Sequence, residues 1–240
     1  MKIKTLLVDD EKLARQELRF LLQEFPNVEI VGEAQNADEA VELAREHKPD
    51  LLFLDINMPE KSGFDLLEEL DEAPEVVFVT AYDQYAIQAF DTNALDYILK
   101  PVKPDRLQKA IEKVSEALAN KPKRDRTADL KPDSQVFIKD GEKCFFVKLS
   151  DIFMFESAGN YVKVHFGQKA PLLHKSLNLL ETKLPQDMFF RANRKEMINM
   201  TYIQNIESYF KGGLHVTLKS GHNVEVSTRQ AVRFKELMSL

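Results

Sequence analysis

The chain has 240 residues, enough for one large domain or two of ordinary size, and 44% of them are hydrophobic, which supports packed cores. No apolar run reaches the roughly 18 residues of a membrane span, and acidic residues begin at Asp9, too early for a signal peptide. The single cysteine, Cys144, excludes an internal disulfide framework and is expected in a strand core, so we expect a cytoplasmic protein with no membrane partner.

The net charge of −6 conceals two halves of opposite sign. Residues 1–118 hold 13 Lys and Arg against 26 Asp and Glu, a net of −13, whereas residues 119–240 hold 20 against 13, a net of +7. Such an asymmetry indicates separate tasks. The basic half could meet a polyanion, because phosphate contacts depend on Lys and Arg, although a solvated surface without a ligand would have the same charge.

In the first half, short apolar strands alternate with amphipathic helical segments. Strands are expected at residues 4–8, 28–33, 51–54, 76–79 and 97–99, and helices at 13–25, 37–46, 64–70, 84–90 and 104–118. Five such βα units predict an α/β fold, a doubly wound five-stranded parallel sheet. Asn36 is expected to cap the second helix, and Pro104 to lie in the first turn of the last one.

Residues 119–134 combine two prolines with many charges, a composition typical of a linker. Beyond them strands are expected at 135–138, 144–148, 152–156, 161–166, 214–218 and 223–226, with helices at 177–184 and 229–238. Turn signals such as Asp140-Gly141 separate the strands. The sequence therefore predicts two domains, residues 1–118 and 135–240, of which the second is mostly β.

Reactive side chains follow four of the five strands in the first half. They are Asp9, Asp10, Asp55, Thr80 and Lys100. Because the carboxyl ends of parallel strands meet at one edge of a sheet, we expect these side chains to converge. Asp55 is then the candidate phosphoryl acceptor, and Lys100 and Thr80 could each bind a phosphoryl oxygen.

Clustered carboxylates also suit Mg²⁺, a hard cation that takes oxygen ligands. The candidate ligands are Asp9, Asp10, Asp55 and the backbone carbonyl of Asn57, two residues past Asp55. A bound Mg²⁺ would neutralise an incoming phosphoryl group. A phosphatase with an Asp-x-Asp nucleophile is the alternative, and Asn57 in place of the second Asp argues against it.

The pairs Asp9-Asp10, Thr80-Ala81 and Lys100-Pro101, with Asp55 followed by Met58-Pro59, occur in an order and spacing that resemble the receiver domain of two-component response regulators. The resemblance covers about residues 2–118. It implies that Asp55 takes a phosphoryl group from a sensor histidine kinase, and that the peptide bond before Pro101 is cis. It further implies a switch made of Thr80 and Tyr97, after which a face near residues 84–90 and 104–111 forms a homodimer.

Three segments of the second half place Asn, Arg or Lys near turns, at residues 155–164, 189–199 and 226–229. Arg can bind guanine edges with two hydrogen bonds, and Asn suits adenine. With the helix Ser176–Leu184 and the pair Ile198-Asn199, they resemble the LytTR-type DNA-binding domain over about residues 135–240. The resemblance implies a mostly β domain that enters DNA through loops, with contacts from Asn160, Lys163, Asn193, Arg194, Lys195 and Arg229. The family commonly has His-Arg-Ser where this chain has Asn193-Arg194-Lys195.

These features together predict a transcriptional regulator of a two-component system. Phosphorylation of Asp55 is expected to dimerise the receiver, so that two basic domains bind direct repeats in promoter DNA. No catalytic constellation follows residue 134, so no enzymatic output is expected beyond the receiver's own phosphotransfer and dephosphorylation. The alternative is a receiver joined to a β module that binds a protein partner, or single-stranded RNA through aromatic residues such as Tyr161, Phe189 and Tyr209.

Overall fold

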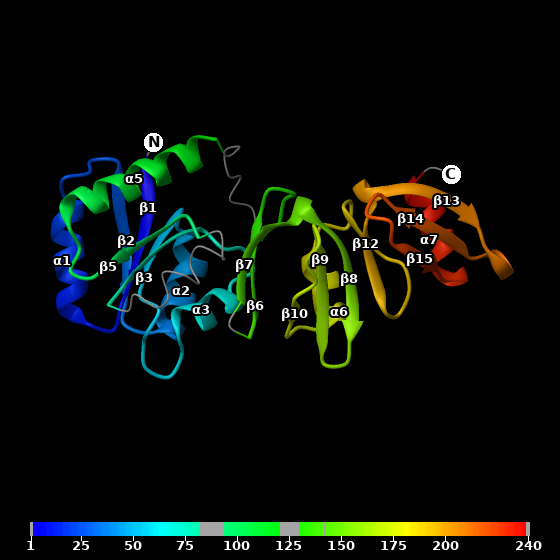
Figure 1. Cartoon of the computed structure of the whole chain (residues 1–240), viewed down its shortest axis with the longest axis horizontal. Coiled ribbons are helices and arrows are strands. Elements are labelled where there is room, and N and C mark those ends of the chain that lie inside the picture. The colour runs from blue at the N-terminus through cyan, green and yellow to red at the C-terminus, as the bar shows by residue number, and fades with distance from the viewer. Residues whose placement is uncertain (1, 82–93, 121–129, 142, 239–240) are drawn as a thin grey trace. The chain divides into compact units, whose positions relative to one another are not determined.

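A computed structural model of the protein describes residues 2–81, 94–120, 130–141 and 143–238 (Figure 1). Its contacts divide the chain into two compact units, residues 1–127 with 135–146 and residues 128–134 with 147–240. The helix expected at residues 84–90 lies outside the described residues, as does most of the expected linker. No described helix is both long and apolar enough to cross a bilayer.

The first unit contains a five-stranded parallel sheet, which confirms the predicted fold. The strands are β1 (Ile3–Val8), β2 (Val28–Ala34), β3 (Leu51–Leu54), β4 (Glu75–Thr80) and β5 (Asp96–Leu99), in the spatial order β2-β1-β3-β4-β5. The described helices are α1 (Lys12–Leu22), α2 (Ala37–His47), α3 (Gly63–Glu69) and α5 (Pro104–Ala119). The strand order reverses between β1 and β3, the position at which such sheets bind ligands outside the carboxyl ends of their strands.

Helices cover both faces of this sheet, with α1 and α5 on one face and α2 and α3 on the other (Figure 1). Strand β3 is buried along its whole length. Its residues alternate between the two cores: Leu52 and Leu54 pack with α2 and α3, whereas Leu51 and Phe53 pack with α1 and α5. Burial on two faces explains why this strand is a continuous apolar run.

The helix ends depend on local capping. The Asn36 side chain accepts a hydrogen bond from the Glu39 N–H, as predicted, and Pro104 lies in the first turn of α5. Helix α1 ends at Leu22 and not at Phe25 as expected. The Phe25 N–H instead bonds to the Leu22 carbonyl in a tighter turn, because Pro26 disfavours helical geometry in the residue before it.

A two-stranded sheet, β6 (Gln135–Asp140) and β7 (Lys143–Lys148), comes next in the chain. By its contacts, the stretch from Gln135 to Phe146 groups with the first unit, although the sequence places it in the second predicted domain. The side chains of Phe137, Cys144 and Phe146 are buried in the same core as α3.

The second unit is mostly β, as predicted. One sheet has the order β10-β9-β8-β12-β11 and the other the order β13-β14-β15, and both are antiparallel. The strands are β8 (Ile152–Ala158), β9 (Tyr161–Phe166), β10 (Leu172–Leu173), β11 (Phe189–Arg191), β12 (Glu196–Asn199), β13 (Ile203–Ser208), β14 (Leu214–Leu218) and β15 (Asn223–Val226). The helices are α6 (Leu177–Lys183), α7 (Thr228–Met238) and the short 3₁₀ helices η1 (Leu149–Asp151), η2 (Met200–Tyr202) and η3 (Phe210–Gly212).

Four of these strands, β10 to β13, were not predicted as strands. Strands β10, β11 and β12 have two to four residues, too few to show an alternating pattern. Strand β13 is longer, but a register shift between Ile203 and Asn205 breaks its alternation. Pairing with a neighbour therefore defines these strands more than their own composition does.

Candidate functional site

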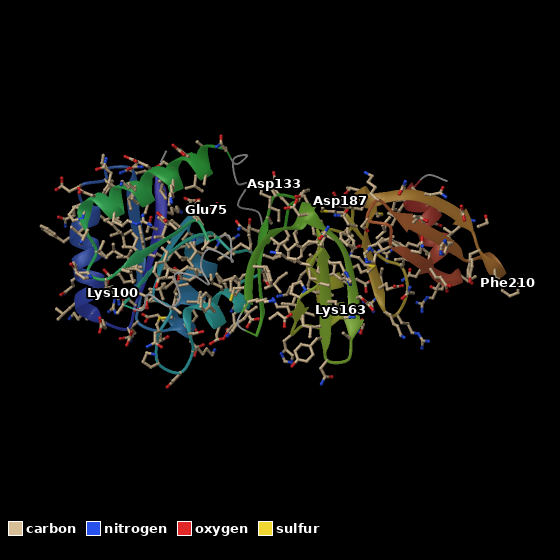
Figure 2. The ribbon with its side chains drawn as sticks, in the orientation of Figure 1. Glu75, Lys100, Asp133, Lys163, Asp187 and Phe210 are labelled. Carbon is tan, nitrogen blue, oxygen red and sulfur yellow. The ribbon has the colours of Figure 1, made fainter. Side chains whose placement is uncertain are left out.

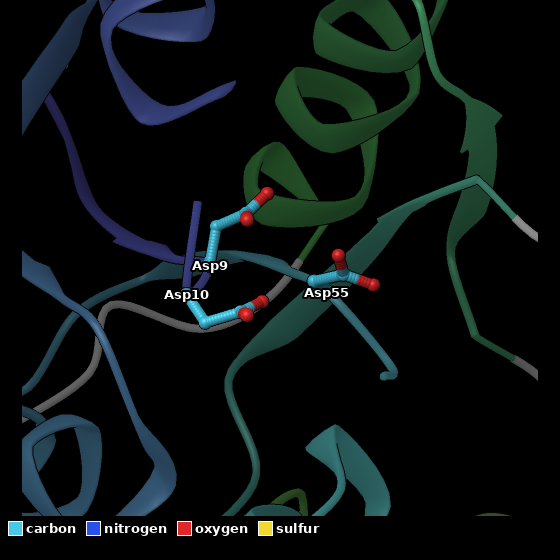
Figure 3. A group of neighbouring side chains, drawn as sticks. All are labelled: Asp9, Asp10 and Asp55. Atoms are coloured by element: carbon cyan, nitrogen blue, oxygen red, sulfur yellow. The ribbon is translucent and has the colours of Figure 1, made fainter. Parts of the chain in front are cut away.

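Three carboxylates meet at the carboxyl edge of the parallel sheet (Figure 3). Oxygens of Asp9, Asp10 and Asp55 all lie within 4.8 Å of one another. The Asp55 N–H donates to the Val8 carbonyl at 2.8 Å, so the β1–β3 pairing extends up to the site. Asp9 and Asp55 are buried and Asp10 is exposed, so the cluster reaches solvent on the side of Asp10. The predicted convergence of these residues is therefore present in the fold.

Lys100 brings a positive charge into this cluster. Its Nζ lies 2.7 Å from Asp9 Oδ2 and 2.7 Å from Asp55 Oδ2. The Lys100 N–H donates to the Thr80 carbonyl at 2.9 Å, which fixes the end of β5 beside the end of β4. The peptide bond between Lys100 and Pro101 is cis, as the family resemblance implied.

Burial and ion pairing act together on the protonation of these groups. Burial raises the pKa of Asp9 above its ordinary value, and the hydrogen bonds from Lys100 and from the Glu11 N–H only partly offset it. For Lys100, burial acts to lower the pKa, but hydrogen bonds to Asp55 and Asp9 outweigh it, and the pKa is raised. Lys100 therefore stays positively charged at neutral pH and links the two buried carboxylates.

A close backbone approach positions the loop after Asp55. The Gly63 N–H donates to the Ile56 carbonyl at 2.8 Å, and a Cβ on Gly63 would lie 2.4 Å from the Asp55 carbonyl oxygen. Only glycine fits there. Ser62 and Asp65 form a capping box that starts α3 directly after this loop. Gly63 was not predicted as a site residue, and the one signal for it in the sequence is the Ser62-Gly63 pair before an apolar helix.

Thr80 lies fully buried at the end of β4, and its Oγ1 has no hydrogen-bond partner among the described residues. Buried hydroxyls are nearly always paired, so one without a partner points to a role in binding. Tyr97, the other predicted switch residue, is half-buried and packs against the core formed with α2 and α3. Its backbone carbonyl accepts a hydrogen bond from Arg106 at 2.6 Å.

In the second unit, hydrogen bonds join the three segments that the sequence singled out. The Ser157 N–H donates to the Lys195 carbonyl at 2.7 Å, and the Ser227 N–H donates to the Ala192 carbonyl at 3.0 Å. The turn between β11 and β12 therefore lies between the end of β8 and the start of α7. Residues about 70 positions apart in the chain form one connected surface.

Several of the predicted DNA contacts project from this surface. Arg194, Lys195 and Arg229 are exposed, and Asn160 is exposed in the β8–β9 turn, where Gly159 has a φ of 66°. Lys163 is half-buried on β9, and its Nζ lies 3.7 Å from a Glu156 carboxylate oxygen (Figure 2).

Asn193 and Arg191 hold the turn itself. The Asn193 side-chain Oδ1 accepts hydrogen bonds from the N–H groups of Lys195 and Glu196, and its Nδ2 donates to the Glu225 carbonyl and to the Glu196 carboxylate. The Arg191 guanidinium donates to the carbonyls of Asn193 and Arg194, both at 2.7 Å. This supporting role of Arg191 was not predicted from the sequence, because it depends on contacts between residues that a turn brings together.

A groove runs beside this turn within the second unit. It is lined by Asn193, Arg194, Lys195, Tyr209, Phe210 and Thr228, among others. Phe210 is 77% exposed and Tyr209 is 48% exposed, which is unusual for aromatic side chains in a packed domain. Figure 2 labels Phe210 at the edge of the second unit. The groove therefore combines cations with aromatic surface.

Known families match both units. Residues 5–112 match the response regulator receiver domain, and residues 142–239 match the LytTr DNA-binding domain. The sensory transduction protein LytT of Enterococcus faecalis is 40% identical over 98% of each chain. The sensory transduction protein LytT of Bacillus anthracis is 35% identical, and the transcriptional regulatory protein BtsR of Escherichia coli is 36% identical, each over 99% of this chain and all of the relative.

The receiver match contains the carboxylates of the acidic sheet edge, and the DNA-binding match contains the basic turns of the second unit. The curated relatives share both regions in the same order along almost their entire length. The chain is therefore a response regulator of the LytTR family, with an N-terminal receiver domain and a C-terminal LytTR-type DNA-binding domain.

Proposed function

We propose that the protein is a cytoplasmic transcriptional regulator whose binding to promoter DNA is controlled by phosphorylation of Asp55. The observation that carries this proposal is the convergence of Asp9, Asp10, Asp55 and Lys100 at the sheet edge, beside a buried Thr80 hydroxyl that has no partner in the described part of the chain. A purely structural ion pair would account for Lys100 and one carboxylate. It would not account for two further carboxylates and an unsatisfied hydroxyl.

The side chains at this edge divide the work of phosphoryl transfer. A carboxylate oxygen of Asp55 forms the new bond to phosphorus, while the bond from phosphorus to the imidazole nitrogen of a sensor histidine kinase breaks and its electron pair stays on that nitrogen. Lys100 then leaves its pairing with Asp55 to bind a phosphoryl oxygen, and the Thr80 hydroxyl donates to another. Thr80 and Tyr97 thereby become the switch.

The donor set fits a magnesium ion. Three carboxylates and the Asn57 carbonyl are all oxygen ligands, which a hard cation prefers. Asp9, Asp10, Asp55 and the Asn57 carbonyl would hold it. When bound, Mg²⁺ supplies positive charge that neutralises the phosphoryl oxygens. Three carboxylates against the single Lys100 ammonium leave an excess of negative charge, which favours a divalent cation at this edge.

The basic surface of the second unit is the proposed DNA interface. Arg194, Lys195 and Arg229 reach base edges or the groove walls, together with Asn160 at the β8–β9 turn. Lys163 contacts phosphate. The side-chain amide of Asn193 is engaged in three hydrogen bonds within its own turn and a fourth to the Glu225 carbonyl of β15, so we assign it to presenting Arg194 and Lys195. Phosphorylation dimerises the receiver, and two such surfaces then bind direct repeats.

Phosphate incorporation tests the receiver half of the proposal. Wild-type protein incubated with acetyl phosphate and Mg²⁺ should gain one acid-stable, base-labile acyl phosphate, located at Asp55 by mass spectrometry. Asp55→Asn should gain none and keep its circular dichroism spectrum. Stoichiometric phosphate on the Asp55→Asn protein would contradict the assignment.

The exposed aromatic groups favour a second candidate, which is binding to single-stranded RNA. Tyr209 and Phe210 flank cations in one groove, and bases of single strands stack on such side chains. A competition assay separates the two functions. If RNA oligonucleotides displace the protein from duplex DNA at lower concentration than unlabelled duplex does, the RNA function is the better account.

A further inference from the structure

The β6–β7 hairpin offers an apolar face to the receiver. Side chains alternate between the two faces of a strand, so Phe137 and Lys139 project to one side of β6. Phe137, Cys144 and Phe146 are all buried in the receiver core that contains α3, with exposed fractions of 4%, 3% and 5%. The hairpin is therefore packed against the receiver, and its apolar face is covered.

Aromatic rings form the centre of this contact. Phe137 stacks on Phe64 of α3, with ring centroids 6.2 Å apart and planes 4° from parallel. Phe146 meets Phe137 edge-on at 5.0 Å. Burial of rings of this size contributes strongly to an interface, and such pairs add to it beyond the buried area.

Two polar contacts fix the position of the hairpin. Lys139 Nζ lies 2.6 Å from Asp65 Oδ1, and the Ala73 N–H donates to the Gln135 carbonyl at 2.7 Å. Asp65 also caps α3 through Ser62. One carboxylate therefore serves both the start of α3 and the hairpin.

The same rings continue toward the phosphoacceptor site. Phe64 meets Phe78 of β4 edge-on at 5.2 Å, and Phe78 lies two residues before Thr80. On the other side, Gly63 joins α3 to the loop of Asp55 by a backbone contact that permits no side chain. Phe64 is thus adjacent to both elements that change partners when Asp55 is phosphorylated.

We propose that the β6–β7 hairpin is a docked coupling element, held on α3 of the receiver when Asp55 is unphosphorylated and released when Asp55 is phosphorylated. Strand β7 lies in the region that matches the DNA-binding domain, so release of the hairpin changes how that domain is restrained. The docking stands on its own contacts. Its control by Asp55 rests on the proposed function.

The hairpin is expected to leave α3 on phosphorylation, because the structure shows it docked while Asp55 is unphosphorylated. Lys100 is paired with the free carboxylates of Asp55 and Asp9, so the docked hairpin is complementary to the unphosphorylated receiver. Moving Lys100 and Thr80 to phosphoryl oxygens shifts the ends of β5 and β4, and Phe64 with β4 through its contact with Phe78. By thermodynamic reciprocity, the docked hairpin also disfavours phosphorylation to the same extent.

Cys144 reports on this docking without any label added to the protein. It is the only cysteine, lies at 3% exposure on the docked face, and burial raises the pKa of its thiol to about 12. Its modification by Ellman's reagent therefore requires local opening. The rate of modification in the full-length protein measures how often the hairpin leaves α3.

The variants should differ in the rate at which Ellman's reagent modifies Cys144. Phe137→Ala should raise the modification rate about 100-fold, as loss of a buried phenyl ring implies. Lys139→Ala should raise it roughly threefold, because its ion pair with Asp65 is partly exposed. Lys143→Ala is the matched control, since Lys143 is an exposed lysine of the same hairpin. Each rate is divided by the rate of the same protein in denaturant, because Lys143 adjoins the thiol, and the ratio for Lys143→Ala should equal that of the wild type. Beryllofluoride with Mg²⁺, which mimics a phosphoryl group, should raise the wild-type rate about tenfold and leave Asp55→Asn unchanged.

Three results would overturn the inference. Wild-type Cys144 could react as fast as in denaturant, or Lys139→Ala could react no faster than Lys143→Ala. Beryllofluoride could also leave the wild-type rate unchanged although acetyl phosphate phosphorylates Asp55 in the same protein. The last result refutes the coupling and leaves the proposed function intact. If Asp55 accepts no phosphate at all, the proposed function fails, and the Lys139 and Lys143 variants still decide whether the hairpin docks. Phe137→Ala is compared only if its circular dichroism spectrum is native, and Lys139→Ala keeps the test valid otherwise.

Discussion

Replacement of Thr80 by valine should stabilise the receiver while removing its switch. Thr80 is fully buried, and its hydroxyl has no partner among the described residues. Leaving a hydroxyl buried and unsatisfied costs about 1–3 kcal/mol, and valine has nearly the same shape without that group. Thr80→Val should therefore raise the free energy of unfolding by about 1–2 kcal/mol, which corresponds to a few degrees in melting temperature.

Thr5 supplies a matched control in the same sheet. It is equally buried on β1, but its Oγ1 donates to the Ile3 carbonyl at 3.1 Å. Thr5→Val removes a satisfied hydrogen bond and should destabilise the receiver by about 0.5–1.5 kcal/mol. The two chemically identical substitutions should thus have opposite signs in scanning calorimetry. A Thr80→Val protein that melts below the wild type would show that the hydroxyl is satisfied, and would refute the reasoning.

Four further substitutions test other parts of the structure. Burial acts to raise the pKa of Asp96, but hydrogen bonds from Arg106 and Lys113 outweigh it, so the pKa lies below its ordinary value of 3.8. The ion pairs therefore stabilise the fold above pH 3.8, and this stabilisation is lost as the pH falls through the lowered pKa. Asp96→Asn should cost roughly 1–3 kcal/mol near neutral pH, and a difference in melting temperature from the wild type that persists undiminished at pH 2 would argue against this origin. Arg229→Ala should reduce discrimination between specific and random duplexes by about 1–3 kcal/mol, whereas Lys163→Ala should weaken both equally; equal losses for Arg229→Ala would reassign it to phosphate. Arg191→Ala should loosen the turn of Arg194 and Lys195 and so lower affinity for every duplex, with its melting temperature as the control, and an unchanged affinity would show that the turn holds without it.

The sheet of the receiver could be predicted because its strands are buried on both faces. The strand Leu51–Leu54 is apolar throughout and is followed directly by the charged Asp55, so its bounds were predicted correctly. The convergence of Asp9, Asp55 and Lys100 followed from the parallel topology alone. Gly63 could not be predicted in the same way, since its importance lies in how close a Cβ at this position would come to the Asp55 carbonyl oxygen.

The second unit was harder to predict because its contacts are made across turns. Because Asn193 is a polar residue in a turn, the sequence favours a contact with DNA. In the structure its side-chain amide instead donates to Glu196 and Glu225 of the same chain. The packing of the β6–β7 hairpin was equally hard to predict from the sequence. Apolar residues on both faces of β6 and β7 indicate burial on two sides, but no local pattern says that Phe64 covers Phe137. Long-range pairing decides both cases.

The central claim is that phosphorylation of Asp55 controls the binding of DNA. It is tested most directly by selecting a random duplex DNA library on the full-length protein, wild type and Asp55→Asn, with and without acetyl phosphate. The account predicts an enriched, directly repeated motif that the wild type binds more tightly when acetyl phosphate is present, with no such change for Asp55→Asn. No enrichment, or the same enrichment with and without acetyl phosphate, would contradict it.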